Sequence, residues 1–168
     1  MDEKHYRAML TGQRSRAAGE QLENIIEASC LHYRLKRVAE IEKTPEPSKQ
    51  LTKMDRYGRF TACYEKRAQP DYKGTLAGGR SVVFEAKHTD ADRLQQSAVT
   101  QEQEKRLNWH MELGAECFVL VSFGFREFFK VPWEVFRTMK EHYGRKYIKP
   151  GDVQEYKIQY LGGVLRFL

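Results

Sequence analysis

The segment 115–123, AECFVLVSF, constrains the fold most, because it is almost continuously apolar. A strand with one solvated face alternates apolar and polar residues, whereas an unbroken apolar run is typical of a central strand covered on both faces. In the segment 91–113 before it, Val99, Leu107 and Met111 recur at multiples of four residues, the spacing of one helix face. We therefore expect a helix over 91–113 that ends at Gly114 and leads into a buried strand.

The rest of the chain adds further helices and strands. Residues 15–33 predict an amphipathic helix whose inner stripe is Ala18, Leu22, Ile25, Ile26, Ser29 and Tyr33. Strands are expected at 35–43, 60–68, 82–87 and 126–132, a short helix with Pro132 at its start at 132–144, and a weakly strand-like tail at 153–168. Helices and strands in this order predict an α/β fold, a mixed central sheet flanked by helices, in a single domain over 1–168.

Composition narrows the classes of protein. The chain has 168 residues, 40% of them hydrophobic, and neither a signal-peptide pattern nor a spanning apolar stretch, so we expect a cytoplasmic protein without a membrane partner. Cys30, Cys63 and Cys117 are too far apart to pair as metal ligands and are expected to be reduced core residues. The five scattered histidines give no support for a zinc site.

A charged pair interrupts the strand at 82–87. Side chains alternate across a strand, so Glu85 and Lys87 share one face, while Val82, Phe84 and Ala86 share the other. One interpretation is a half-exposed strand with a surface ion pair, worth about 0 to 1 kcal/mol. The other is a functional site beside an apolar core.

Two carboxylates offer a metal site. Asp71 and Glu85 meet if the intervening GTLAGG segment reverses the chain, and Mg²⁺ takes such oxygen ligands. A metal there would polarise a phosphate oxygen, while Lys87 would steady a water or the developing negative charge. Glu23, from the first helix, would add a ligand or orient a metal-bound water. This division of roles suits phosphodiester hydrolysis.

The positive charge of the chain, +6 at pH 7, is unevenly distributed. Residues 44–59, between two expected strands, form a polar protrusion with two prolines and many charges, which the core should not need. Basic residues gather in and near it, and either contact nucleic acid or form a solvated loop. We assign to DNA contact Arg14, Arg16, Lys49, Lys53, Arg56, Arg59, Lys66, Arg67, Lys73 and Thr89, the last because it returns to the strand face of Glu85.

These residues resemble a known family. Pro70-Asp71 followed by Glu85-Ala86-Lys87 resembles the PD-(D/E)xK nuclease motif. The order of an Arg-containing arm, a helix with Gly19 and Glu23, KTPEP, PDYKG, FEAKHT, a helix with Gln103, and CFVLVSF resembles the RecU family of Holliday junction resolvases of Gram-positive bacteria and their phages, over about residues 14–131.

The resemblance implies a restriction-endonuclease-like fold and a homodimeric, Mg²⁺-dependent endonuclease, with Mn²⁺ able to substitute, that nicks four-way DNA junctions symmetrically. It implies catalytic roles for Glu23, Asp71, Glu85, Lys87 and Gln103, with Asp71, Glu85 and Gln103 as metal ligands. The protrusion at 44–59 becomes a stalk that enters the junction centre, and 1–16 a basic N-terminal arm. Recombination and branch-migration proteins are further expected partners.

The sequence departs from the family pattern at two places. RAQPD stands where the family commonly has a Ser/Thr-rich run, and His88 stands where many members have a second acid. His88 points to the strand face opposite Glu85, which favours a packing role.

Two other functions fit the same residues, a PD-(D/E)xK nuclease acting on ordinary duplex and a non-catalytic DNA-binding protein of the same fold. The stalk argues against the first, and the retained pair of mutually repelling carboxylates argues against the second. For a two-fold symmetric dimer, the apolar residues Phe125, Phe128, Phe129 and Trp133 are the expected interface candidates, unless they are internal.

Overall fold

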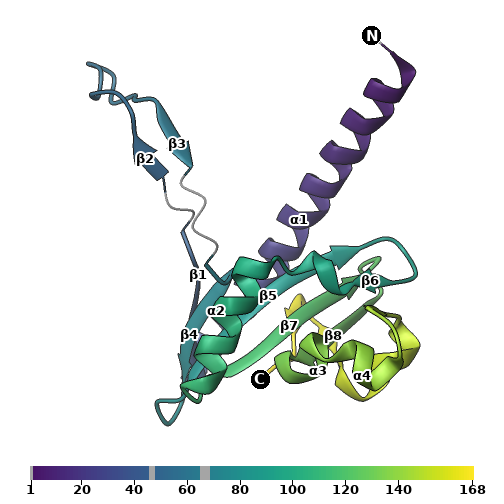
Figure 1. Ribbon diagram of the computed structural model, residues 1–168. Coiled ribbons are helices and arrows are strands. Elements are labelled where there is room, and N and C mark those ends of the chain that lie inside the picture. The colour runs from purple at the N-terminus through teal and green to yellow at the C-terminus, as the bar shows by residue number, and fades with distance from the viewer. Residues whose placement is uncertain (1, 46–47, 65–68) are drawn as a thin grey trace.

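A six-stranded mixed sheet forms the centre of the protein in a computed structural model that describes residues 2–45, 48–64 and 69–168 (Figure 1). In sheet order the strands are β1 (Ala39–Lys43), β4 (Tyr72–Leu76), β5 (Ser81–Thr89), β7 (Glu116–Phe123), β8 (Glu127–Pro132) and β10 (Lys157–Ile158). The β5–β7 pair is parallel and the other pairs are antiparallel. The predicted α/β class with a mixed sheet is confirmed.

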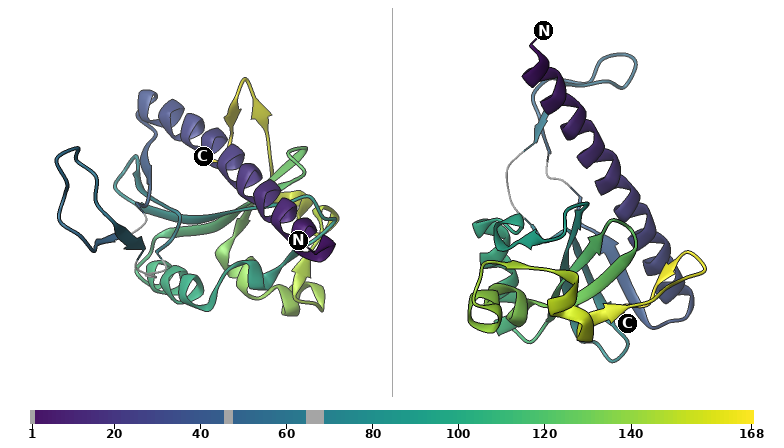
Figure 2. Two further views of the ribbon diagram at one scale, coloured as in Figure 1. Left: turned by 90° about the horizontal axis from the view of Figure 1, so that it is seen from above. Right: turned by 90° about the vertical axis from the view of Figure 1, so that its right-hand side faces the viewer.

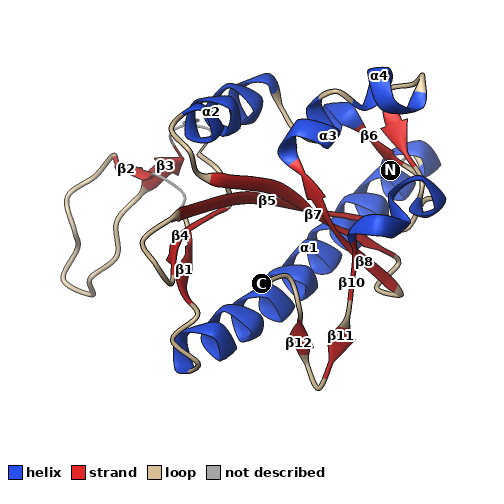
Figure 3. Ribbon diagram, turned by 90° about the horizontal axis from the view of Figure 1, so that it is seen from below, coloured by secondary structure: helices blue, strands red, loops and turns tan. Residues whose placement is uncertain are grey.

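Helices cover both faces of this sheet (Figure 3). On one face lies α1 (Glu3–Leu35), and on the other lie α2 (Gln101–Glu112), α3 (Trp133–Arg137) and α4 (Met139–Tyr143). The remaining elements are short: β2 (Ser48–Gln50), β3 (Ala62–Tyr64), β6 (Leu94–Gln95), η1 (Gln96–Ala98), β9 (Tyr147–Ile148), η2 (Pro150–Tyr156), β11 (Tyr160–Leu161) and β12 (Val164–Leu165).

The sheet separates two apolar clusters, and β7 contributes to both. Phe118 and Leu120 pack toward α1, while Val119 and Val121 pack toward α2, α3 and α4. All four side chains are buried, so the prediction of a central strand covered on both faces is confirmed. Gly114 precedes β7 with a φ of 87°, a left-handed conformation that stops α2 and that few other residues adopt.

Both long helices differ from their predicted bounds. The first begins at Glu3 instead of residue 15, so most of the predicted arm is helical, and its N-terminal half projects from the body (Figure 2). It lacks an apolar stripe there because no sheet lies beneath it, and the stripe was the signal that set the predicted start. The second helix begins only at Gln101, because Thr100 caps it.

The protrusion is longer than predicted, because β3 was assigned to the wrong sheet. Instead of returning beside β1, β3 pairs with β2 in a separate hairpin, and β4 is the partner of β1. The protrusion, here called the stalk, therefore spans residues 44–70, and its hairpin stands away from the body (Figures 1 and 2). It also carries exposed apolar side chains: Leu51, Met54, Tyr57 and Phe60.

Most of the expected interface residues are internal. Phe128, Phe129 and Trp133 are at most 2% exposed, so the prediction that they line a dimer interface is wrong. Phe125 is half-buried and stacks on His88, with ring centroids 4.1 Å apart. The predicted helix at 132–144 is divided at Thr138 into α3 and α4.

Candidate active site

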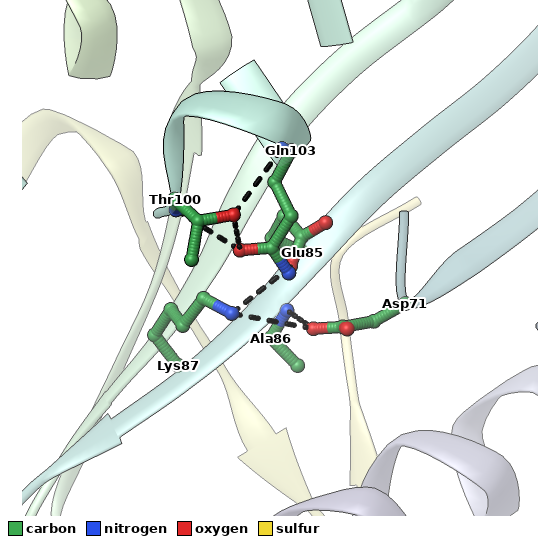
Figure 4. Close-up of polar contacts among 6 residues, drawn as sticks. All are labelled: Asp71, Glu85, Ala86, Lys87, Thr100 and Gln103. Carbon is green, nitrogen blue, oxygen red and sulfur yellow. Dashed lines mark hydrogen bonds and ion pairs between the residues drawn. The ribbon is translucent and has the colours of Figure 1, made fainter. Parts of the chain in front are cut away.

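The hairpin of β4 and β5 brings Asp71 and Glu85 together. Gly78 and Gly79 take positive φ values in its turn, which lets the GTLAGG segment reverse the chain. Tyr72 pairs with Phe84, so Asp71, one residue earlier, falls opposite Glu85. The Asp71 carboxylate accepts the backbone N–H of Ala86 at 3.0 Å (Figure 4). The approach of the two carboxylates that the sequence predicts is therefore present.

Gly74 explains the small residue in PDYKG. A Cβ at this position would lie 2.2 Å from the carbonyl oxygen of Glu40 on β1. Only glycine permits this close contact of β4 with β1, and the contact fixes the strand that begins directly after Asp71.

Lys87 connects both carboxylates. Its Nζ lies 2.9 Å from Glu85 Oε2 and 3.6 Å from Asp71 Oδ2 (Figure 4). Burial acts to lower the pKa of Lys87, but the charges of Asp71 and Glu85 together outweigh it and raise the pKa above its usual value. The ammonium is therefore protonated throughout the neutral range.

Glu85 is a fully buried carboxylate, with none of its surface exposed. Burial first, and then the charge of Asp71, raise its pKa from the ordinary 4.5 to about 8, although Lys87 acts in the opposite direction. Its Oε1 atom is buried and has no hydrogen-bond partner among the described residues. The interpretation of a half-exposed surface ion pair is therefore wrong.

Gln103 contacts the same Glu85 oxygen as Lys87, Oε2. Its Nε2 donates to Glu85 Oε2 at 2.6 Å, while its Oε1 accepts from the backbone N–H of Thr100 at 3.1 Å (Figure 4). The Thr100 hydroxyl accepts the backbone N–H of Gln103 in return, which completes a capping box at the start of α2. The amide oxygen is thus occupied by Thr100, and the assignment of Gln103 as a metal ligand stays a prediction.

Glu23 lies at a distance from these contacts. It forms an ion pair with Lys43 at 2.6 Å, which joins α1 to the end of β1. The next residue, Thr44, donates its N–H to the backbone carbonyl of Asp71. The structure therefore places Glu23 next to the strand that holds Asp71 but not in contact with the Asp71, Glu85 and Lys87 side chains.

The residues assigned to DNA contact are spread over the molecule. Arg14 and Arg16 are exposed on α1, and Lys53, Arg56 and Arg59 are exposed on the stalk. Lys49 lies on β2, whereas Lys66 and Arg67 lie outside the described residues.

Two more of these residues lie on β4 and β5, the strands of the hairpin that positions the carboxylates. Lys73 is half-buried on β4 and its Nζ donates to Gln69 at 2.9 Å. Thr89 ends β5, where its hydroxyl accepts the N–H of Ala91.

The stalk carries an ordered aromatic tip that sequence reasoning missed. The Tyr57 ring is 65% exposed, and the guanidinium carbons of Arg56 and Arg59 lie 4.8 and 5.0 Å from its centre. Asp55 fixes this turn by accepting the backbone N–H groups of Tyr57 and Arg59. An aromatic between two arginines in the stalk sequence was the available signal.

Cys30, Cys117 and His88 take packing positions, and the side chain of Cys63 lies outside the described residues. Cys30 is buried and Cys117 half-buried, and both are free thiols. The His88 ring forms hydrogen bonds with Ser122 and Asp90, on the strand face opposite Glu85, as expected. Among the described residues, no group of three or more His, Cys, Asp or Glu side chains is arranged to hold a metal ion.

Within residues 2–45, 48–64 and 69–168, none of the helices has the length and apolar character needed to cross a membrane.

The comparison with protein families shows to which family the chain belongs. The family described as "RecU: Recombination protein U" matches residues 17–167, nearly the whole chain. The chain belongs to this family. The matched range contains the stalk and the positions of Asp71, Glu85, Lys87 and Gln103.

The comparisons with solved structures and with curated proteins give less information about the family. Among solved structures, the chain is similar to Hjc of Archaeoglobus fulgidus, a Holliday junction resolvase from an archaeal hyperthermophile, at 14% identity and a TM-score of 0.47. That likeness covers 77% of this chain and 89% of the archaeal one. A search of curated proteins finds no match.

Proposed function

We propose that this RecU family protein is a junction-resolving endonuclease that depends on a divalent metal ion, most simply Mg²⁺. The observation that carries the proposal is the buried Glu85 carboxylate, held by Lys87 and Gln103 beside Asp71. A binding protein gains nothing from a buried carboxylate whose pKa is raised to about 8, whereas perturbed groups of this kind gather at catalytic sites.

The donor set fits a hard cation. In the described part of the chain, Glu85 Oε1 is buried without a hydrogen-bond partner and Asp71 is about one-third exposed, so carboxylate oxygens remain for a metal with oxygen preference. Asp71 and Glu85 would hold the ion. When bound, it would supply Lewis-acid stabilisation of the phosphate and lower the pKa of a water.

The remaining residues prepare this site. Lys87 stays protonated and places positive charge where negative charge develops on the phosphate. Gln103 fixes the Glu85 carboxylate, and the Thr100 cap in turn fixes Gln103. In this role Gln103 is a positioning residue. Glu23 acts with Lys43 at the margin of the site, where it would orient a water beside Asp71.

The stalk supplies selectivity for branched DNA. A four-way junction has an open centre in which phosphate backbones converge. A basic stalk placed there would recognise the shape of the DNA rather than its base sequence. The Tyr57 ring between Arg56 and Arg59 would stack on a base exposed at the branch point. The exposed Arg14 and Arg16 lie on the half of α1 that projects from the same side of the body as the stalk (Figure 2).

Symmetric nicking favours a two-fold dimer with one site in each protomer. The protein would act in recombination and repair in the cytoplasm, alongside branch-migration proteins.

The experiment is cleavage of a synthetic four-way junction and a linear duplex of matched sequence, with Mg²⁺, with Mn²⁺ and with EDTA. We expect cutting of the junction with either metal and none with EDTA. Equal cutting of both substrates would replace the proposal with a duplex nuclease, and binding without cutting under every condition would replace it with a DNA-binding protein.

A further inference from the structure

Two cationic side chains and a histidine lie beside the active site, along one side of α2. Asp71 and Lys73 share a strand face, because Tyr72 between them packs toward α1. Lys73 therefore faces the same side of the sheet as Glu85 and α2. On α2, Arg106 and His110 lie three and seven residues after Gln103, which places them along one flank of the helix.

The direction of this group is set by the helix. Gln103 contacts Glu85, and α2 then runs over β5 and β7 and ends near the β4–β5 turn, where Arg80 donates to the carbonyl of Gly114 (Figure 1). At a rise of about 1.5 Å per residue, His110 lies about 10 Å along the axis from Gln103. Lys73, Arg106 and His110 thus form a path that begins at the catalytic carboxylates, here called the α2 track.

No ion pair neutralises the α2 track among the described residues, although Glu42 of β1 stands opposite Lys73 in the sheet. In the part of the chain that the structure describes, none of its three members takes part in an ion pair, whereas Lys105 on the same helix pairs with Glu102 and Arg80 pairs with Glu116. Burial, followed by the charges of Lys73 and Arg106, lowers the pKa of His110. The positive charges of Lys73 and Arg106 therefore act on His110, and a bound anion would offset them.

We propose that Lys73, Arg106 and His110 bind the backbone phosphates adjacent to the scissile phosphate on the strand being cut. This inference rests on the proposed function, because it takes the Asp71 and Glu85 site as the place of cutting. Lys73 and Arg106 contribute charge, and the His110 imidazole donates an N–H to a phosphate oxygen. The contact is independent of sequence and positions the strand.

The first test is the salt dependence of junction binding in EDTA, where no cutting occurs. Loss of one phosphate contact lowers the slope of log affinity against log salt by about 0.9. We expect this change for Arg106→Gln, about twice this change for the Lys73→Gln and Arg106→Gln double variant, and none for Lys105→Gln. Lys105 is the matched control, since it has the same charge on the same helix but is paired with Glu102.

The second test replaces single phosphates of the junction by neutral methylphosphonates, one position at a time on both sides of the cut. Wild-type affinity should fall at one or two positions next to the cut, and the double variant should not respond there. Slopes equal to that of Lys105→Gln, or the same methylphosphonate response in wild type and double variant, would overturn the inference. Failure of the proposed function would show separately, as a wild-type protein that binds junctions but does not cut them.

Discussion

Replacing Glu85 by glutamine should stabilise the metal-free protein at alkaline pH while abolishing cutting. Glutamine keeps the shape of the side chain and can still accept from Lys87 and Gln103, but it removes the buried charge. An acid whose pKa is raised in the folded state destabilises the fold once the pH exceeds its unfolded value, and the full penalty is reached above the folded value. For Glu85 this window runs from about pH 4.5 to about 8.

The size of the effect follows from the shift. One pKa unit corresponds to about 1.4 kcal/mol, so the stability gain of Glu85→Gln over wild type should grow by an amount on the order of 3 kcal/mol between pH 5 and pH 8. For a chain of this length, that amounts to a difference in Tm of about 6 to 12 °C. Lys87 does not contribute to this window, because its raised pKa affects stability only at higher pH.

The assay is urea and thermal unfolding of wild type and Glu85→Gln in EDTA at pH 5, 6.5 and 8. Glu112→Gln is the matched control, since Glu112 is an exposed carboxylate at the end of α2. A gain for Glu85→Gln that is the same at pH 5 and pH 8, or a loss of stability at pH 8, would refute the argument from buried charge.

Three further predictions follow from the site, the stalk and the expected dimer. Asp71→Asn should abolish cutting but leave junction binding in EDTA nearly unchanged, and Mg²⁺ should raise the Tm of wild type but not of this variant; cutting at the wild-type rate would remove Asp71 from the site. Tyr57→Ala should weaken junction binding by about 1 to 3 kcal/mol while duplex binding at the same salt stays constant, because stacking requires an exposed base. The signal of 2-aminopurine at the branch point reports this stacking, and the same signal with wild type and variant would contradict the prediction. Sedimentation should give a dimer at micromolar concentration, and an active monomer would contradict symmetric assembly.

The core and the central carboxylates could be predicted from sequence because each rests on local periodicity. The unbroken apolar run fixed β7, and strand alternation placed Glu85 and Lys87 on one face. The approach of Asp71 to Glu85 required only that a glycine-rich turn reverse the chain. These are short-range arguments, and tertiary packing did not override them.

Features that depend on distant partners were missed. The sequence pattern cannot tell whether β3 pairs with β1 or with β2, because a short alternating strand fits either neighbour. An exposed helical extension such as the start of α1 has no apolar stripe to mark it. Phe128, Phe129 and Trp133 were expected at an interface because the sequence does not show that the sheet has an apolar cluster on each face, Phe128 on the α1 side and Phe129 and Trp133 on the α2 side.

Contacts within the site were also missed because they depend on partners that are distant in the sequence. The resemblance implied a metal-ligand role for Gln103, and no local pattern shows that its amide bonds to Thr100 on one side and Glu85 on the other. The partner of Glu23, Lys43, comes from an element whose position relative to α1 no local pattern reveals.

The most direct measurement of the central claim is a map of the nicks in a four-way junction with each strand end-labelled in turn. With Mg²⁺, wild type should give two nicks at positions related by the two-fold symmetry of the junction, and Glu85→Gln should bind the same junction without giving any. Unpaired or scattered nicks, or nicks that persist at the same positions in Glu85→Gln, would contradict resolution of junctions by the Asp71 and Glu85 site.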